Sequence, residues 1–234
     1  MKKIIALTVL TLASFNSFAN DNAKRLIEML IKEDIAVFRN NGNSNIRHSI
    51  PRVNASQLIN EYSNNQYKYE KTYNNQVINI KTVASGVKTD LSGDPFVVAN
   101  GKNQFEYVSL ELKNKDDAMN INKGNKLDLI CIGTKDNVMF PILKKCVTSD
   151  SYFQGFLEKI MININELNEA DTPKNIYDAF YLAFLKFDTQ KPNALNKYKT
   201  LKDLKSDKLT FDEIIASVKA SLKEENVITV MPKP

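Results

Sequence analysis

The fold is decided by residues 77–112, which read VINIKTVASGVKTDLSGDPFVVANGKNQFEYVSLEL. Apolar and polar residues alternate along much of this stretch, as half-buried strands require. Asp90–Asp94 supplies a turn between strands, and Asn100-Gly101 is typical of a hairpin. The pattern therefore predicts three strands, over Val77–Val87, Phe96–Ala99 and Phe105–Leu112.

Two more strands follow in the sequence. They are predicted over Leu127–Ile132 and Val138–Val147, and Pro141 indicates an edge or a bulge in the second of them. A short helix or turn is expected over Asp116–Asn122, between the third and fourth strands. Five short strands with a small helical element at that place follow the OB-fold pattern.

Helical patterns flank this β segment on both sides. On the N-terminal side we expect a helix capped by Asn22, a polar linker over residues 40–52 and a helix capped by Asn54. On the C-terminal side, apolar residues at helical spacing from Phe153 to Leu167 predict a further helix. Thr172-Pro173 and a Thr210/Glu213 capping box each predict the start of another.

The predicted fold class is therefore α+β, a five-stranded OB-fold barrel with helices at both ends. The expected organisation is a signal peptide over 1–19, an N-terminal helix and linker over 20–53, an OB-fold domain with its leading helix over 54–149, and a helical C-terminal region over 150–234.

The first nineteen residues have the features of a secretory signal. Lys2 and Lys3 precede the apolar run Ile4–Ala13, and Ser17-Phe18-Ala19 has small residues where a signal peptidase needs them. A membrane anchor is the alternative, but it needs about 20 apolar residues. We expect a mature chain that begins near Asn20 and is periplasmic or secreted, without a cysteine for lipid attachment and without a transmembrane segment after cleavage.

The composition is that of a globular protein. Of the 234 residues, 43% are hydrophobic and 25% charged, which excludes collagen-like and polytopic membrane proteins. A single histidine, His48, and two cysteines exclude a histidine-rich or multi-cysteine metal site. The sequence contains no nucleotide-binding loop and no serine-hydrolase motif. We therefore expect no catalytic residues, no cofactor and no metal.

The net charge is weakly basic. It is +5 for the whole chain and +3 without Lys2 and Lys3, since 30 basic residues then face 27 acidic ones. Only four of the basic residues are arginines. Arginine is the usual partner of phosphates and guanine edges, so this balance is a poor match for a strong nucleic-acid binder.

Several short motifs occur in a family-like order between Ala55 and Val147. They are Gln57–Tyr62, Asn65, Tyr73–Val77, Asp94–Val98, Asn122–Leu127, Cys131–Gly133 and Leu143–Cys146. In order and spacing they resemble the tRNA_anti-like family of small exported OB-fold proteins and lipoproteins. The resemblance implies an OB fold and export, and its link to nucleic acids is an analogy with tRNA-binding OB domains. This chain differs in lacking a lipidation cysteine and in carrying a helical C-terminal region.

Cys131 and Cys146 are expected to form a disulfide. They lie late in the fourth and fifth predicted strands, which are neighbours in a hairpin, and an exported chain meets oxidising conditions. A tight turn at Asp136-Asn137 would place Cys131 nearer Ile142, unless a bulge at Pro141 shifts the register. Two buried free thiols are the alternative.

A candidate ligand-binding face lies on the second and third strands. Phe105 and Tyr107 share one face of the third strand, and Lys81, Lys88 and Lys102 are expected nearby. Exposed aromatics on this face of OB folds stack on ligands, and lysines hold phosphates. The alternative is that both rings pack beneath the flanking helices.

These features favour an exported, non-enzymatic module that binds a partner protein or an anionic ligand. Binding of single-stranded nucleic acid in the periplasm, during DNA uptake or transfer, is the alternative and has weaker support. A hydrolase is a third possibility, for which no residue spacing provides a site.

Overall fold

The computed structural model describes residues 12–136 and 139–223. Contacts divide these residues into two compact units. The helical unit comprises residues 12–42 and 157–223, and the sheet unit comprises residues 43–156. Most of the expected signal peptide, residues 1–11, lies outside the described part. Residues 12–19 form the beginning of helix α1 (Leu12–Arg39).

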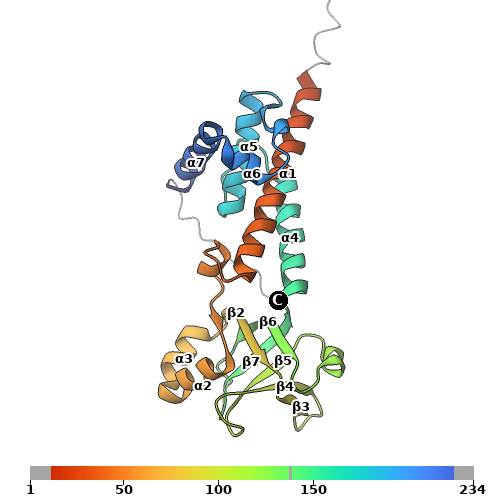
Figure 1. Cartoon of the computed structure of the whole chain (residues 1–234), viewed down its shortest axis with the longest axis vertical. Helices are drawn as coiled ribbons and strands as arrows, with labels where there is room; N and C mark the ends of the chain where they lie inside the picture. Colours follow the sequence, from red (N-terminus) through yellow and green to blue (C-terminus); the bar gives the residue numbers. More distant parts are fainter. Residues whose placement is uncertain (1–11, 137–138, 224–234) are drawn as a thin grey trace, which may run out of the picture. The chain divides into compact units, whose positions relative to one another are not determined.

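The sheet unit contains one mixed sheet of seven strands in the order β1-β2-β6-β7-β5-β4-β3 (Figure 1). The pairs β1–β2 and β5–β7 are parallel, and the other pairs are antiparallel. The strands are β1 (Arg52–Val53), β2 (Val77–Val83), β3 (Gly86–Thr89), β4 (Pro95–Asn100), β5 (Tyr107–Leu112), β6 (Lys126–Gly133) and β7 (Ile142–Thr148).

This sheet differs from the closed five-stranded barrel expected from the sequence. The first expected strand, Val77–Val87, is divided at Ala84 and Ser85, where the chain changes its pairing partner. β2 pairs with β6, whereas the Ser85 N–H already donates to the carbonyl of Val98 in β4 (2.7 Å), and β3 continues along β4. β2 and β3 therefore stand near opposite ends of an open order. A short strand at Arg52–Val53 lengthens the sheet within the expected linker.

Helices α2 (Ala55–Asn64) and α3 (Gln66–Tyr73) lie side by side next to the sheet (Figure 1), and α2 contacts β2, β4 and β5. Asn54 caps α2, as predicted, because its side chain accepts a backbone N–H from the first turn (2.9 Å). Asn65 ends α2 and caps α3 in the same way. The short helix expected between the third and fourth strands is the 3-10 helix η2 (Lys115–Asn120).

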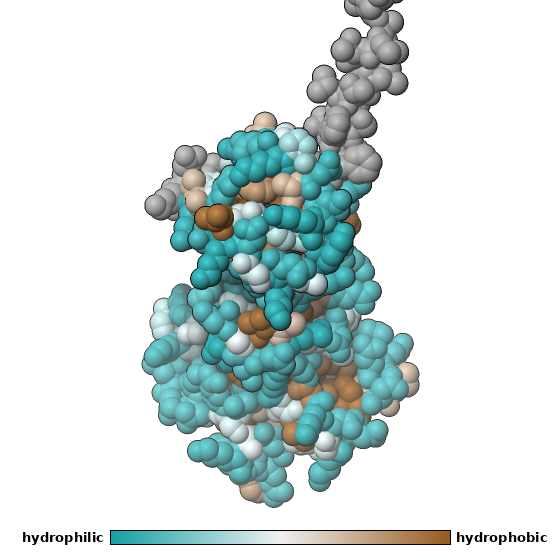
Figure 2. All heavy atoms as spheres, turned by 45° about the horizontal axis from the view of Figure 1, so that its top comes forward, coloured by the Kyte–Doolittle hydropathy of each residue, from teal (hydrophilic) through white to brown (hydrophobic). Residues whose placement is uncertain are grey.

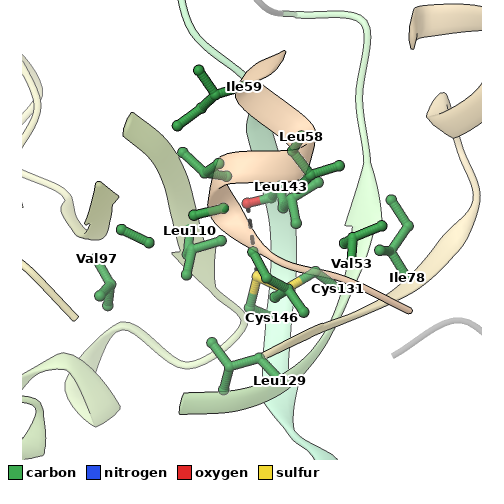
Figure 3. Close-up of a cluster of buried hydrophobic side chains, with 14 of the residues drawn as sticks. Val53, Leu58, Ile59, Ile78, Val97, Leu110, Leu129, Cys131, Leu143 and Cys146 are labelled. Atoms are coloured by element: carbon green, nitrogen blue, oxygen red, sulfur yellow. Dashed lines mark hydrogen bonds between the residues drawn. A yellow bond between two sulfur atoms is a disulfide. The ribbon is translucent and has the colours of Figure 1, made fainter. Parts of the chain in front are cut away.

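The core of the sheet unit surrounds a disulfide between Cys131 and Cys146, as Figure 3 shows. Both residues are buried, and the side chains of Leu110, Leu129 and Leu143 belong to the same cluster. The Cys146 sulfur lies 3.8 Å from the Leu143 carbonyl oxygen. The expected pairing of the cysteines is therefore present, at the centre of the apolar core.

A bulge in β7 brings the two cysteines together. Ile130 pairs with Val147 and Ile132 pairs with Lys144, so Cys131 faces two residues of β7 at once. One of these, Lys145, has a φ of 52°, the left-handed conformation that such a bulge uses. The bulge lies at Lys145, whereas the sequence pointed to Pro141, which precedes β7. Part of the expected fifth strand, Val138, lies outside the described residues.

A buried polar cluster links β2, β6 and the start of helix α4 (Ser149–Glu166). The fully buried Asn79 donates from its amide to Asp128 (2.7 Å) and Ser149 (3.2 Å), and the Ser149 hydroxyl donates to the same carboxylate (2.5 Å). Lys81 lies 3.2 Å from the other oxygen of Asp128. Burial alone would raise the pKa of Asp128, but these bonds outweigh it and hold that pKa below its ordinary value.

We expect Asp128→Asn to weaken the acid sensitivity of the sheet unit. A carboxylate with a lowered pKa in the folded state stabilises the protein above its unfolded pKa of about 3.9, and this contribution is lost as pH falls through the folded pKa. Because Asp128 is partly exposed, the effect is about 1 kcal/mol or less. Urea unfolding from pH 6 down to pH 3 measures it. Parallel loss of stability in wild type and variant would contradict the assignment.

The helical unit is held together partly by buried acids with neutral donors. Tyr177 donates its hydroxyl to Asp34 (2.7 Å), and Asn22 donates its amide to Asp188 (3.2 Å). Asn22 therefore lies inside α1 and does not cap it. Besides α1 and part of α4, the unit contains α5 (Ile176–Gln190), η3 (Ala194–Lys197), α6 (Leu201–Ser206) and α7 (Lys208–Lys223).

Two further predicted helix starts in this unit are also wrong. Asn175 caps α5 by accepting two backbone N–H groups (2.9 and 3.0 Å), so the helix begins after Thr172-Pro173. The capping box is formed by Thr200 and Asp203 at α6, whereas Thr210 lies within α7. The predicted start of α5 is thus three residues early, and α7 is capped by Asp207, whose side chain accepts the Thr210 N–H (3.3 Å).

Candidate ligand-binding groove

A groove with a volume of about 610 Å³ lies in the sheet unit, over β4, β5 and the start of β7. The turn Asp90–Asp94 lines it on one side, and Met139 and Phe140, just before β7, line it on another. All of the lining residues belong to the sheet unit. We call this feature the β4–β5 groove.

The alternation of side chains along β5 determines which of its residues line the β4–β5 groove. Tyr107, Ser109 and Glu111 in β5 line it, whereas Val108 and Leu110 between them are fully buried in the core. Successive side chains of a strand point to opposite faces, so one face of β5 builds the core and the other builds the groove.

Aromatic and apolar side chains supply much of the lining. The rings of Tyr107 and Phe140 are stacked, with centroids 4.3 Å apart and planes at 30°, and Phe96 also lines the groove. Leu91 and Met139 line it too, although both side chains are largely exposed to solvent. Figure 2 shows a mostly hydrophilic face, on which hydrophobic side chains gather in a few places. Exposed apolar side chains that gather around a hollow are typical of a binding site.

The charged residues of the lining are mainly acidic. Asp90, Asp94 and Glu111 line the groove together with one basic residue, Lys115, which leaves two excess negative charges among the described lining residues. The Lys115 ammonium lies 2.6 Å from the Asp94 carboxylate and so compensates it. One oxygen of Asp90 accepts backbone N–H groups of its own turn (2.8 and 2.9 Å).

Glu111 is only weakly compensated by a cation. Its described ion pair is with Lys144 at 4.0 Å, and Lys144 lies closer to Asp136, at 3.1 Å. Burial raises the pKa of Glu111; Lys144 acts against this, and neighbouring aspartates act with it. The groove therefore disfavours added negative charge near Glu111.

The structure brings two of the five predicted ligand-binding residues to this groove. Tyr107 lines it, and the Lys88 ammonium lies 5.5 Å from the centroid of the Tyr107 ring. Phe105 is largely exposed but does not line the groove. Lys81 is paired with Asp128 elsewhere in the sheet, and Lys102 lies in the exposed link between β4 and β5.

The sequence analysis missed Phe96, Glu111 and Phe140. Two of them carried a usable signal: Phe96 alternates with the buried Val97, and Glu111 has the same strand parity as Tyr107. Phe140 lies within the fifth strand expected from the sequence, Val138–Val147, but the structure places it before β7, outside any strand.

The described residues were also compared with the requirements of a metal site and of a membrane-spanning helix. Among residues 12–136 and 139–223, no three His, Cys, Asp or Glu side chains gather closely enough to hold a metal ion. His48 is exposed in the short helix η1 (Ile46–His48). None of the helices in this described part is both long and apolar enough to cross a membrane.

Comparison with known proteins gives one match. The family model of tRNA_anti-like proteins matches residues 1–147, more than half of the 234 residues and nearly all of the sheet unit. No curated protein and no solved structure matches the chain.

Proposed function

Since this chain belongs to the tRNA_anti-like family, we propose that it is an exported, non-enzymatic binding module of the OB-fold type. In this proposal the β4–β5 groove holds an extended segment of a partner protein. The observation that carries it is the lining, in which a stacked aromatic pair and exposed apolar side chains lie beside three carboxylates and one lysine.

The strand pairing supports the OB-fold part of the proposal. β2 and β3 are separated only by Ala84 and Ser85, so they are consecutive parts of one bent strand that pairs with β6 at one end and β4 at the other. The pairs β6–β7, β7–β5 and β5–β4, of which β7–β5 is parallel, are those expected of an OB fold. In that description the groove lies on the second and third strands and their flanking loops, where OB folds bind ligands.

The charges favour a polypeptide over an anionic ligand. A phosphate placed in the groove would approach Asp90, Asp94 and Glu111, whereas a peptide presents neutral backbone groups and side chains. Single-stranded nucleic acid remains a second candidate because of one observation. Tyr107 stacks with Phe140 beneath the Lys88 ammonium, an arrangement that can hold a base and its phosphate.

We expect the full-length chain to select binders from a displayed library of random short peptides. Tyr107→Ala should weaken the selected peptides about tenfold or more, because a buried aromatic contact dominates such an interface. Phe105→Ala is the matched control, since Phe105 is exposed but outside the groove, and it should bind as the wild type does. Isothermal titration with a synthetic selected peptide gives both affinities.

The same protein should not bind a labelled oligothymidylate, even at about 50 mM salt, where phosphate contacts are strongest. Failure to enrich any peptide, together with Tyr107-dependent binding of the oligonucleotide, would replace the first function by the second. Melting curves of both variants confirm that they are folded.

Two features support the export part of the proposal. Residues 1–19 have signal-peptide character, and the Cys131–Cys146 disulfide is compatible with an oxidising compartment. Cleavage after Ala19 would keep Asn20, whose side chain accepts the Tyr181 hydroxyl (2.8 Å). The mass of the protein isolated from the periplasm tests this, and an intact residue 1 would contradict it.

A further inference from the structure

We infer that the β4–β5 groove selects partner segments that carry a lysine or arginine four residues away from an apolar or aromatic side chain. This inference rests on the proposed function, since it names the chemistry of the segment bound at the same site. Three observations lead to it. Tyr107 and Glu111 lie on the same face of β5, positive and negative side chains lie at different ends of the groove, and Glu111 has only a distant cation beside it.

The parity of β5 sets the spacing. Tyr107 and Glu111 lie four residues apart on the same face of β5, a distance of about 13 Å along an extended strand. An extended peptide also shows every second side chain on one face. A side chain that packs on Tyr107 and Phe140 and one that reaches Glu111 must therefore have the same parity in the bound segment.

The charges give the groove a direction. The Lys88 ammonium lies above the Tyr107 ring, so a second cation is unfavourable at the aromatic end. At the other end, Glu111 is joined by Asp90 and Asp94 in the lining. An apolar side chain is thus favoured over the rings and a cation at the carboxylate end.

Glu111 is the carboxylate with which a lysine or arginine of the partner would form an ion pair. Lys144 is its described cation, at 4.0 Å, and is engaged more closely by Asp136. Lys115 is held at 2.6 Å by Asp94, so it does not serve Glu111. A guanidinium or ammonium from a partner would make a charge-assisted bond there, in a partly buried place where such bonds are stronger than on an open surface.

The test uses synthetic peptides of equal length and the full-length protein. Each peptide has one phenylalanine, and the residue four positions away is lysine, glutamine or glutamate; a further peptide carries the lysine three positions away. We expect the lysine peptide to bind about tenfold more tightly than the glutamine peptide, and the glutamate peptide to bind most weakly. The lysine three positions away should give no gain.

Variants of the protein test whether Glu111 causes the higher affinity for the lysine peptide. Glu111→Gln should abolish the difference in affinity between the lysine and glutamine peptides. Glu111→Lys should reverse the order of affinities, so that the glutamate peptide binds most tightly. Glu106→Gln removes an acid just before β5, outside the groove, and should leave the order unchanged. Both substituted positions are partly exposed, and melting curves check folding.

The outcomes distinguish a failure of the basic selectivity from a failure of peptide binding itself. Equal binding of the lysine and glutamine peptides, with both lost in Tyr107→Ala, would overturn the basic selectivity and leave the peptide-binding function standing. A preference for lysine that survives Glu111→Gln would also overturn it. Failure of every peptide to bind would overturn the proposed function itself.

Discussion

Replacing both cysteines by alanine should lower the free energy of unfolding of the sheet unit by about 3 kcal/mol. The bond between Cys131 and Cys146 closes a loop of 15 residues, and the loss of that constraint on the unfolded chain accounts for an effect of this size. For a unit of this length, the melting temperature should fall by roughly 10–20 °C. The disulfide lies in the core, so its removal also leaves small gaps in packing.

Urea unfolding with and without dithiothreitol measures this effect. Reductant should shift the wild-type transition toward that of Cys131→Ala/Cys146→Ala and leave the variant unchanged, which makes the variant its own control. If the variant were as stable as the oxidised wild type, the disulfide would have no structural role, and the argument from it to an oxidising compartment would fail.

Gly133→Ala should destabilise the sheet unit by about 3 kcal/mol. A Cβ at this position would collide with the backbone carbonyl oxygen of Tyr73, and the backbone cannot move away easily. The Gly133 N–H donates to the Gln76 carbonyl (3.0 Å), and its carbonyl accepts the Asn75 N–H (2.8 Å). Such overpacking against a fixed backbone is at the upper end of what small-to-large substitutions cost.

Gly155→Ala is the matched control for this substitution. Gly155 is exposed in α4, and an added Cβ would have no neighbour within 4 Å. Alanine there should stabilise by about 0.5–1 kcal/mol, because it favours the helix over the unfolded chain. Paired urea transitions compare the two. Similar small effects for both substitutions would contradict the close contact between the end of β6 and the end of α3.

The strands could be predicted because their signal is local. Alternation in residues 77–112 and the Asn100-Gly101 hairpin located most of β4 and all of β5, and Asn54 marked the start of α2 correctly. The division of the first strand at Ala84 could not be seen, because it is a change of pairing partner and the alternation of side chains continues through it.

The β7 bulge was missed for a different reason. A positive φ is usually signalled by glycine or asparagine, yet here it falls on Lys145, which has no such signature. The sequence contained a more obvious candidate in Pro141, and it did not reveal that Cys131 must meet two residues of β7. Tertiary pairing, which brings the sulfur atoms together, decides the position.

The candidate site was only partly predictable. Tyr107 followed from strand parity, whereas Lys88 lies just after the first predicted strand, Val77–Val87, and belongs to β3. Phe140 could not be found, because a ring in a loop is placed by the strands on either side of it. The acidic character of the site was also hidden, since Asp90 and Glu111 lie far apart in the sequence and meet only in the groove.

The central claim is that the β4–β5 groove is the binding surface. Titration of a library-selected peptide into the isotope-labelled protein, followed by backbone amide chemical shifts, tests it most directly. The account predicts that the largest changes occur at Leu91, Phe96, Tyr107 and Glu111, with little change at Phe105 or around the disulfide. Changes centred on another surface, with these four amides unmoved, would contradict it.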